Sequence, residues 1–287
     1  MTGTVRTTPS GTSRAAAIFD LDKTVMSTHA VTAFRGPLRR EGMMQRADAV
    51  RAAFTHYLYV VADADHEQMM RMRSYLCSLI AGWRPEQIER IVEEALAEVI
   101  APKVYEEAVA LMAEHRAQGR AIVIASSAAR PFVVPIARML GADDVIASEV
   151  AVKDGVCTGE LDFHAYGQDK ADRVRSVARL RGYDLDASYA YSDSETDVPL
   201  LDMVGHPYVV NPDGAMSKEA ADQGWPVLFF YSPVSATEKI DRLDPPKKVA
   251  LMVGLGLVAA AVAMLGLVTL RDAVRSSRAG LASLKRQ

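Results

Sequence analysis

Along most of this chain, short and mainly apolar runs alternate with longer stretches in which apolar and polar residues recur with helical spacing. Such short runs are typical of strands buried on both faces. They lie at residues 15–19, 121–125, 144–147, 188–192, 208–210 and 227–230. The helical stretches, each followed by a glycine, lie at residues 105–118, 132–140 and 169–181. This alternation predicts an α/β fold with a doubly wound parallel sheet.

Two segments interrupt the alternation. Residues 28–101 have helical character almost throughout, with a break before Pro85, where a new helix is expected to begin. Residues 150–163 carry glycines between apolar positions, which indicates a β-hairpin. We predict a disordered leader at residues 1–14 and a helical insert at 28–101. The core would consist of two pieces, residues 15–27 and 102–232.

The C-terminal part of the chain has a third pattern. Residues 249–270 include no charged side chain, and at about 1.5 Å per residue a helix of this length covers roughly 33 Å, enough to cross a bilayer core. Lysines precede the segment and Arg271 follows it, as is common at membrane interfaces. We predict a linker at 233–248, a transmembrane helix at 249–270 and a basic tail at 271–287. The alternative is a buried core helix, which is usually shorter.

Two clues bear on the side of the membrane where the main domain lies. The tail is more basic than the segment before the span, so the positive-inside rule places the tail in the cytoplasm. Residues 1–13 lack the basic start and apolar run of a secretory signal, which argues against export of the main domain. We give the second clue more weight and expect a cytoplasmic domain anchored to the cell membrane. A helix that lies in the interface would satisfy both clues.

Charge and cysteine content narrow the classes of function. The chain carries a formal net charge of −3, and because residues 271–287 carry +4, residues 1–270 carry −7. Nucleic-acid binding relies on Lys and Arg that neutralise phosphates, so the negative net charge of residues 1–270 argues against it. Cys77 and Cys157 supply neither a disulfide framework nor the ligand spacing of a zinc site, and so few cysteines fit a reducing compartment.

Candidate chemistry begins directly after the first predicted strand. Asp20 and Asp22 follow it with one residue between them, at the edge where open α/β sheets bind ligands. In an extended chain both side chains point the same way. One carboxylate can then attack phosphorus while the other transfers a proton, and both can lie near a cation. The alternative is a solvated acidic turn.

Later positions favour the catalytic interpretation. Ser126 follows the second strand and can donate a hydrogen bond to a phosphate oxygen, or cap a helix. Lys170 can neutralise a phosphate, or be an exposed residue at a helix start. Asp193 and Asp197 follow another strand and offer the oxygen ligands that Mg²⁺ prefers. Four such sites, three of them at strand ends, together favour a catalytic site for a phosphate group.

These motifs resemble those of the haloacid dehalogenase superfamily of phosphatases, in its phosphoserine-phosphatase-like branch (subfamily IB). The resemblance covers about residues 15–230. Its motifs are DLDKT at 20–24, AIVIA followed by Ser126, then Lys170, and DSETD at 193–197. The set is specific for the superfamily and weak for the substrate. It implies that the insert at 28–101 is the helical cap of that branch.

The resemblance also implies a mechanism. Asp20 would be the nucleophile that forms an aspartyl-phosphate, and Asp22 the general acid and base. Mg²⁺ would be bound by the carboxylates of Asp20 and Asp193 and by the main-chain carbonyl of Asp22. Ser126 and Lys170 would stabilise the charge on the phosphoryl oxygens. Thr24 would support the loop, and Asp197 would orient Lys170 or a metal-bound water.

One position departs from the family pattern. In true phosphoserine phosphatases an acidic residue nine positions after the nucleophile binds the substrate ammonium, and here that position is His29. Imidazole is a poor partner for ammonium, which disfavours phosphoserine and makes His29 a candidate for substrate specificity. The alternative is that His29 only packs at the cap hinge.

The predicted function is Mg²⁺-dependent hydrolysis of a phosphomonoester by a membrane-anchored enzyme. Its substrate would be a small phosphorylated metabolite or a lysophospholipid-type phosphate. Phosphotransfer to an alcohol would use the same residues. The alternative from another class is a membrane-bound regulatory protein that binds a phosphorylated ligand without turnover, although such a protein has no need of Asp22 as acid and base. The sequence leaves the oligomeric state open.

Overall fold

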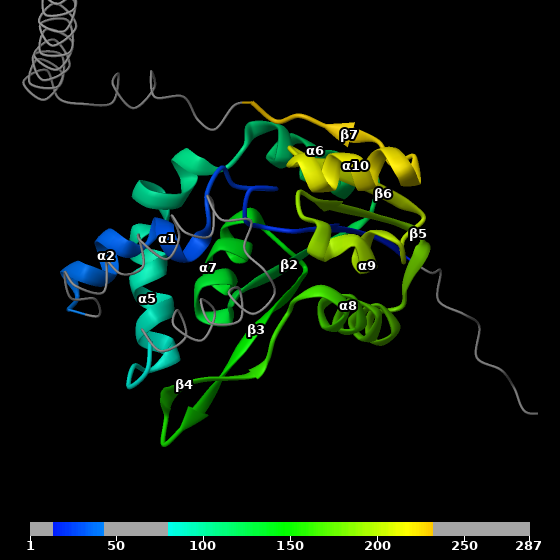
Figure 1. Ribbon diagram of the computed structural model, residues 1–287. Coiled ribbons are helices and arrows are strands. Elements are labelled where there is room, and N and C mark those ends of the chain that lie inside the picture. Colours follow the sequence, from blue (N-terminus) through cyan, green and yellow to red (C-terminus); the bar gives the residue numbers. More distant parts are fainter. Residues whose placement is uncertain (1–13, 43–79, 232–287) are drawn as a thin grey trace, which may run out of the picture. The chain divides into compact units, whose positions relative to one another are not determined.

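The computed structural model describes residues 14–42 and 80–231, which form a seven-stranded sheet with helices around it (Figure 1). The strands are β1 (Arg14–Phe19), β2 (Ala121–Ala129), β3 (Asp144–Lys153), β4 (Val156–Phe163), β5 (Tyr183–Ser192), β6 (His206–Val210) and β7 (Val227–Leu228). Their order across the sheet is β4-β3-β2-β1-β5-β6-β7. All neighbours pair in parallel except β3 and β4, which are antiparallel. The chain thus winds outward on both sides of β1.

Helices cover both faces of the sheet. They are α1 (Ala30–Ala33), α2 (Arg35–Arg40), α5 (Pro85–Ala95), α6 (Glu106–Ala117), α7 (Arg130–Leu140), α8 (Gly167–Arg181), α9 (Val198–Leu201) and α10 (Gly214–Gln223). Phe19 of β1 belongs to one apolar cluster with Met112 of α6 and Ile136 of α7. Its neighbour Ile18 belongs to a second cluster with Val174 of α8. Because successive strand residues point to opposite faces, both faces of β1 are buried, which confirms the predicted doubly wound α/β class.

Each strand predicted from the apolar runs is present, and most are longer than predicted. β7 is the exception, with two residues instead of the predicted 227–230. The hairpin between β3 and β4 turns at Asp154 and Gly155, whose φ angles of 54° and 78° lie in the left-handed region that tight hairpin turns require. Helix α10 is an element that the pattern did not predict; the side chain of Asp213 caps it by accepting from the Met216 amide at 2.9 Å.

The insert leaves and re-enters the core at neighbouring points. Its described parts are helical: α1 and α2 follow the first linker, and α5 with the π-helical turn Leu96–Ile100 precedes the second. The Ser27 amide donates to the Lys103 carbonyl at 2.8 Å, and the Tyr105 amide donates to the Val25 carbonyl at 2.9 Å. The two connecting segments, residues 25–27 and 103–105, therefore run side by side, and the first of them lies a few residues after Asp22. The boundaries of the cap stay a prediction, because residues 43–79 lie outside the described residues.

Within residues 14–42 and 80–231, no helix has both the length and the apolar character needed to cross a membrane. The predicted leader, linker, transmembrane helix at 249–270 and tail lie outside the described residues, apart from Arg14, which already belongs to β1. The chain divides into two compact units, Met1–Val234 and Ser235–Gln287, and every described residue belongs to the first. Membrane anchoring stays a prediction.

A buried histidine packs against β1 from the side of α6. The ring of His115 meets that of Phe19 edge-on, and its Nε2 lies 2.8 Å from the Tyr191 hydroxyl. A guanidinium nitrogen of Arg120 lies 3.0 Å from Nδ1, so Nδ1 must accept and Nε2 must carry the proton. Burial, and then the charge of Arg120, lower the pKa of His115 to about 4. His115 is therefore neutral in the folded protein at neutral pH.

We expect acid to destabilise the fold through this histidine. In the unfolded chain its pKa is about 6.5, so between that value and about 4 the unfolded state binds more protons, and the free energy of unfolding falls as the pH falls. Between about pH 7 and about pH 5 the loss should reach about 1–2 kcal/mol in urea denaturation. His115→Gln cannot take up this proton and should lose less. The same loss in both proteins would contradict the assignment.

Candidate active site

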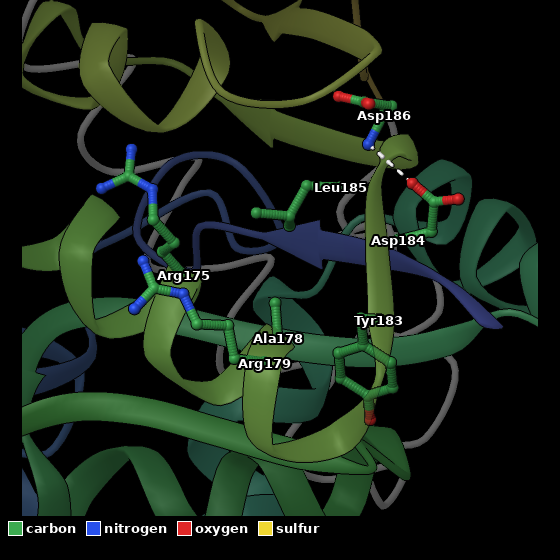
Figure 2. A pocket seen from close by; sticks show the side chains of 7 residues that line it. All are labelled: Arg175, Ala178, Arg179, Tyr183, Asp184, Leu185 and Asp186. Atoms are coloured by element: carbon green, nitrogen blue, oxygen red, sulfur yellow. Dashed lines mark hydrogen bonds between the residues drawn. The ribbon is translucent and has the colours of Figure 1, made fainter. Parts of the chain in front are cut away.

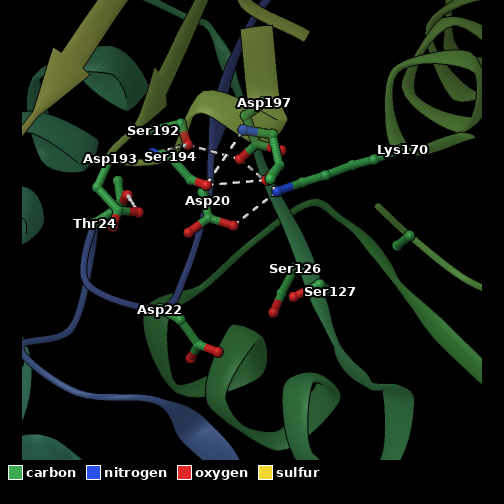
Figure 3. Close-up of polar contacts among 12 residues, drawn as sticks. Asp20, Asp22, Thr24, Ser126, Ser127, Lys170, Ser192, Asp193, Ser194 and Asp197 are labelled. Atoms are coloured by element: carbon green, nitrogen blue, oxygen red, sulfur yellow. Dashed lines mark hydrogen bonds and ion pairs between the residues drawn. The ribbon is translucent and has the colours of Figure 1, made fainter. Parts of the chain in front are cut away.

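The predicted catalytic residues meet at the carboxyl edge of the three central strands (Figure 3). Asp20 follows β1, Ser126 lies near the end of β2, and Asp193 follows β5. Lys170 comes from the first turn of α8, and Asp197 ends a short 3-10 turn. Because β1 lies between β2 and β5, polar groups from distant parts of the sequence converge on Asp20, as expected at the switch point of an open α/β sheet.

Lys170 joins two carboxylates in the protein interior. Its Nζ lies 2.7 Å from Oδ1 of Asp20 and 2.8 Å from Oδ2 of Asp197, and only 2% of its side chain is exposed. Burial lowers the pKa of Lys170, but the charges of Asp197 and Asp20 more than offset it, so the pKa lies above its usual value. The Ser192 hydroxyl donates to Oδ2 of Asp197 at 2.6 Å and fixes that carboxylate. Lys170 is thus a fixed positive charge beside Asp20.

The site nevertheless holds more negative than positive charge. Burial raises the pKa of Asp20 well above its usual value, and Lys170 opposes this effect. The charges of Asp197, Asp193 and Asp22 raise the pKa of Asp20 further. Lys170, and Lys23 whose charge acts on Asp193, are two positive charges against four neighbouring carboxyl groups. The arrangement therefore favours a bound cation, which would let the carboxylates ionise together.

Asp193 is the second carboxylate suited to a metal ion. Burial raises its pKa to about 6, although the Thr24 hydroxyl donates to its Oδ1 at 3.0 Å. The described part of the chain contains no group of three or more His, Cys, Asp or Glu placed to hold a metal ion. The predicted ligand set needs only the carboxylates of Asp20 and Asp193 and the main-chain carbonyl of Asp22. These all-oxygen donors fit Mg²⁺, which usually keeps several waters in its shell.

Asp22 lies apart from the ion-paired group, where the chain enters the insert (Figure 3). Its Oδ1 accepts from the Ala30 amide at 2.7 Å, and its Oδ2 lies 3.5 Å from Nδ1 of His29. Between Asp22 and Thr24, Lys23 has a φ of 63°, a left-handed conformation that side chains rarely adopt. This sharp turn separates the direction of Asp22 from that of Thr24.

Serine hydroxyls complete the site. Ser126 is fully buried, and its Oγ accepts from the Ala128 amide at 3.1 Å, a bond that leaves the hydroxyl proton to be donated. Ser192 and Ser148 support the site and were missed by the sequence analysis. Ser148 donates to the Ser127 carbonyl at 2.7 Å and so ties β3 to the end of β2. The only signal was their place in or after an apolar run, which does not distinguish them from ordinary strand residues.

A cavity of about 300 Å³ lies between the second half of α8 and the start of β5 (Figure 2). Its lining residues are Arg175, Ala178, Arg179, Tyr183, Asp184, Leu185 and Asp186. β5 begins beside this cavity and ends at the edge that carries Asp193, so the cavity lies at the opposite edge of the sheet. None of the predicted catalytic residues lines it.

A family model for haloacid dehalogenase-like hydrolases matches residues 17–202. The chain is 43% identical over 256 residues to the "Inhibition of morphological differentiation protein" of Streptomyces azureus, covering 89% of this chain and 92% of the relative. It is 42% identical over 260 residues to a "Probable phosphatase" of Mycobacterium tuberculosis, covering 88% and 90%. A phosphoserine phosphatase solved as a phospho-aspartyl intermediate analogue shares the fold, at 17% identity and a TM-score of 0.54, over 76% of this chain and 94% of that one. The chain therefore belongs to the haloacid dehalogenase-like hydrolase family, as a phosphatase.

Proposed function

We propose that this phosphatase hydrolyses a phosphomonoester through an aspartyl-phosphate on Asp20, with Mg²⁺ bound beside it. The observation that carries the proposal is the buried contact of Lys170 with Asp20 at 2.7 Å. A carboxylate must be ionised to attack phosphorus, and burial opposes ionisation because it raises the pKa of Asp20. Lys170 and a divalent cation together would supply the positive charge that ionisation needs.

We propose that the reaction has two steps. First, an oxygen of Asp20 attacks the phosphorus and the bond to the leaving oxygen breaks, while Asp22 gives its proton to that oxygen. Second, Asp22 takes a proton from a water whose oxygen attacks the phosphorus and frees Asp20. Ser126 and Lys170 would stabilise the phosphoryl oxygens in both steps. The carboxylates of Asp20 and Asp193 and the carbonyl of Asp22 would hold Mg²⁺, whose charge would offset the repulsion between nucleophile and phosphate.

The substrate that we propose is a small phosphorylated metabolite or a lysophospholipid-type phosphate. His29 stands where an acidic residue would bind the ammonium of phosphoserine, which argues against phosphoserine itself. The lipid alternative depends on the apolar segment 249–270, which would anchor the enzyme to the membrane that contains such a substrate.

Removal of the metal is expected to lower phosphate release at least about 100-fold, because a bound cation supplies several kcal/mol of charge stabilisation. The full chain in mild detergent would be treated with EDTA and assayed on amino-acid, sugar and lysophospholipid phosphates before and after addition of Mg²⁺. Recovery with Mg²⁺ supports the proposal. An unchanged rate after EDTA treatment would contradict the role of the metal, and no release from any substrate would contradict hydrolysis.

A regulatory protein that binds a phosphorylated ligand without turnover is the second candidate. It is favoured by the name of the Streptomyces relative, which refers to differentiation. Retention of Asp22 favours the enzyme, because a binding protein needs no acid–base group. Tight binding of a phosphate ester with no release of phosphate would favour the regulatory protein.

A further inference from the structure

The carboxylate of Asp22 faces two consecutive residues at the start of the insert. Oδ1 accepts from the amide of Ala30 at 2.7 Å, and Oδ2 lies 3.5 Å from Nδ1 of His29. The side chains of Asp22 and His29 are 18% and 32% exposed, so neither is locked by burial alone. The orientation of Asp22 therefore depends on these two contacts, only one of which comes from a side chain.

The backbone of His29 is itself held in place. His29 is the N-cap residue of α1, and its carbonyl accepts from the Thr32 hydroxyl at 2.9 Å and from the Ala33 amide at 3.1 Å. These bonds fix the point from which the imidazole projects, and its Nδ1 faces Asp22. Because α1 opens the insert, this contact also joins Asp22 to the first helix of the predicted cap.

We infer that His29 is a positioning residue for Asp22, which it holds in the orientation that protonates the leaving oxygen. The inference rests on the proposed function, in which Asp22 is the general acid. Proton transfer requires the donor within hydrogen-bond reach of the leaving oxygen, and small errors of position cost much of the rate. His29 acts through Asp22 and touches no reacting atom. This role differs from substrate recognition, which would leave Asp22 unaffected.

The test is the dependence of kcat/KM on the leaving group, measured with the full chain over phenyl phosphates that differ only in ring substituents. 4-Nitrophenolate leaves readily without a proton, whereas phenolate needs one. His29→Ala should lose about 10-fold more kcat/KM with phenyl phosphate than with 4-nitrophenyl phosphate, since general acids contribute 10²- to 10⁴-fold. His29→Asn, whose amide nitrogen can replace Nδ1, should restore most of the loss.

Two controls separate the outcomes. Asp22→Asn removes the acid itself and should show the same or a stronger dependence on the leaving group. If it does not, the proposed role of Asp22 is wrong; if it does and His29→Ala does not, only the positioning role is wrong. His206→Ala, an exposed imidazole stacked on Tyr189, should change neither substrate. An equal loss with all leaving groups in His29→Ala would indicate a role in binding or folding and would overturn the inference.

Discussion

Replacement of Asp20 by Asn is expected to lower phosphate release by about 10⁴-fold or more. An amide cannot attack phosphorus at a useful rate, and removal of a nucleophile commonly costs this much. The change is nearly isosteric, and Lys170 keeps its contact with Asp197 at 2.8 Å, so the fold should persist. Phosphate release and acid-quenched transfer of labelled phosphate to the protein would be measured together. Only the wild type should become labelled.

The matched control for this experiment is Asp202→Asn, which alters an exposed aspartate at the end of α9. It should retain the wild-type rate and labelling. Turnover by Asp20→Asn within about 10-fold of wild type would exclude Asp20 as the nucleophile, since removal of a nucleophile is expected to cost far more than that.

Replacement of Lys170 by Met is expected to affect both activity and stability. The rate should fall about 10³-fold, because a positive charge next to the transferring phosphoryl group is lost. The free energy of unfolding should fall by about 3 kcal/mol at neutral pH in metal-free buffer, because the buried Asp20 and Asp197 lose the lysine that pairs with both. This deficit should shrink as the pH falls, since protonation of a carboxyl group removes the uncompensated charge. Urea denaturation at several pH values would measure it.

Lys218→Met is the corresponding control for Lys170. Lys218 lies on α10, pairs with Asp222 at 2.8 Å, and has 79% of its side chain exposed. Exposed pairs of this kind contribute little to stability, so no measurable change is expected in rate or in unfolding. If Lys170→Met were as stable as this control at neutral pH, the buried ion-pair cluster would not be the structural unit described above.

Several features of the fold could be predicted because they are encoded locally. The run at 121–125 is continuously apolar because helices cover both faces of a parallel sheet, and this property needs no knowledge of the partner strands. The glycines after α7 and α8 have φ angles of 71° and 72°, the left-handed conformation that ends helices. Other features were missed. Helix α10 was not predicted, and β5 begins at Tyr183, five residues before the predicted start at 188.

For His29, the motif predicted a position along the chain but not the direction of the side chain. Its distance along the chain from Asp20 identified it as a residue near the substrate, which is a statement about position only. The direction of its imidazole toward Asp22 depends on the turn at Lys23 and on the start of α1. Neither the turn nor the helix start is apparent from the residue types, because a lysine rarely adopts a φ of 63°.

The sequence by itself determined the class of fold and the chemical groups of the site, because strand ends in a parallel sheet share one edge and Asp20, Ser126 and Asp193 each follow a predicted strand. Only the tertiary structure decided which groups touch. Lys170 lies 150 residues from Asp20, and their contact at 2.7 Å depends on how α8 packs against the sheet. Local periodicity records which face of a helix is buried, whereas a contact between distant residues also requires the order of the strands and the path of each crossover.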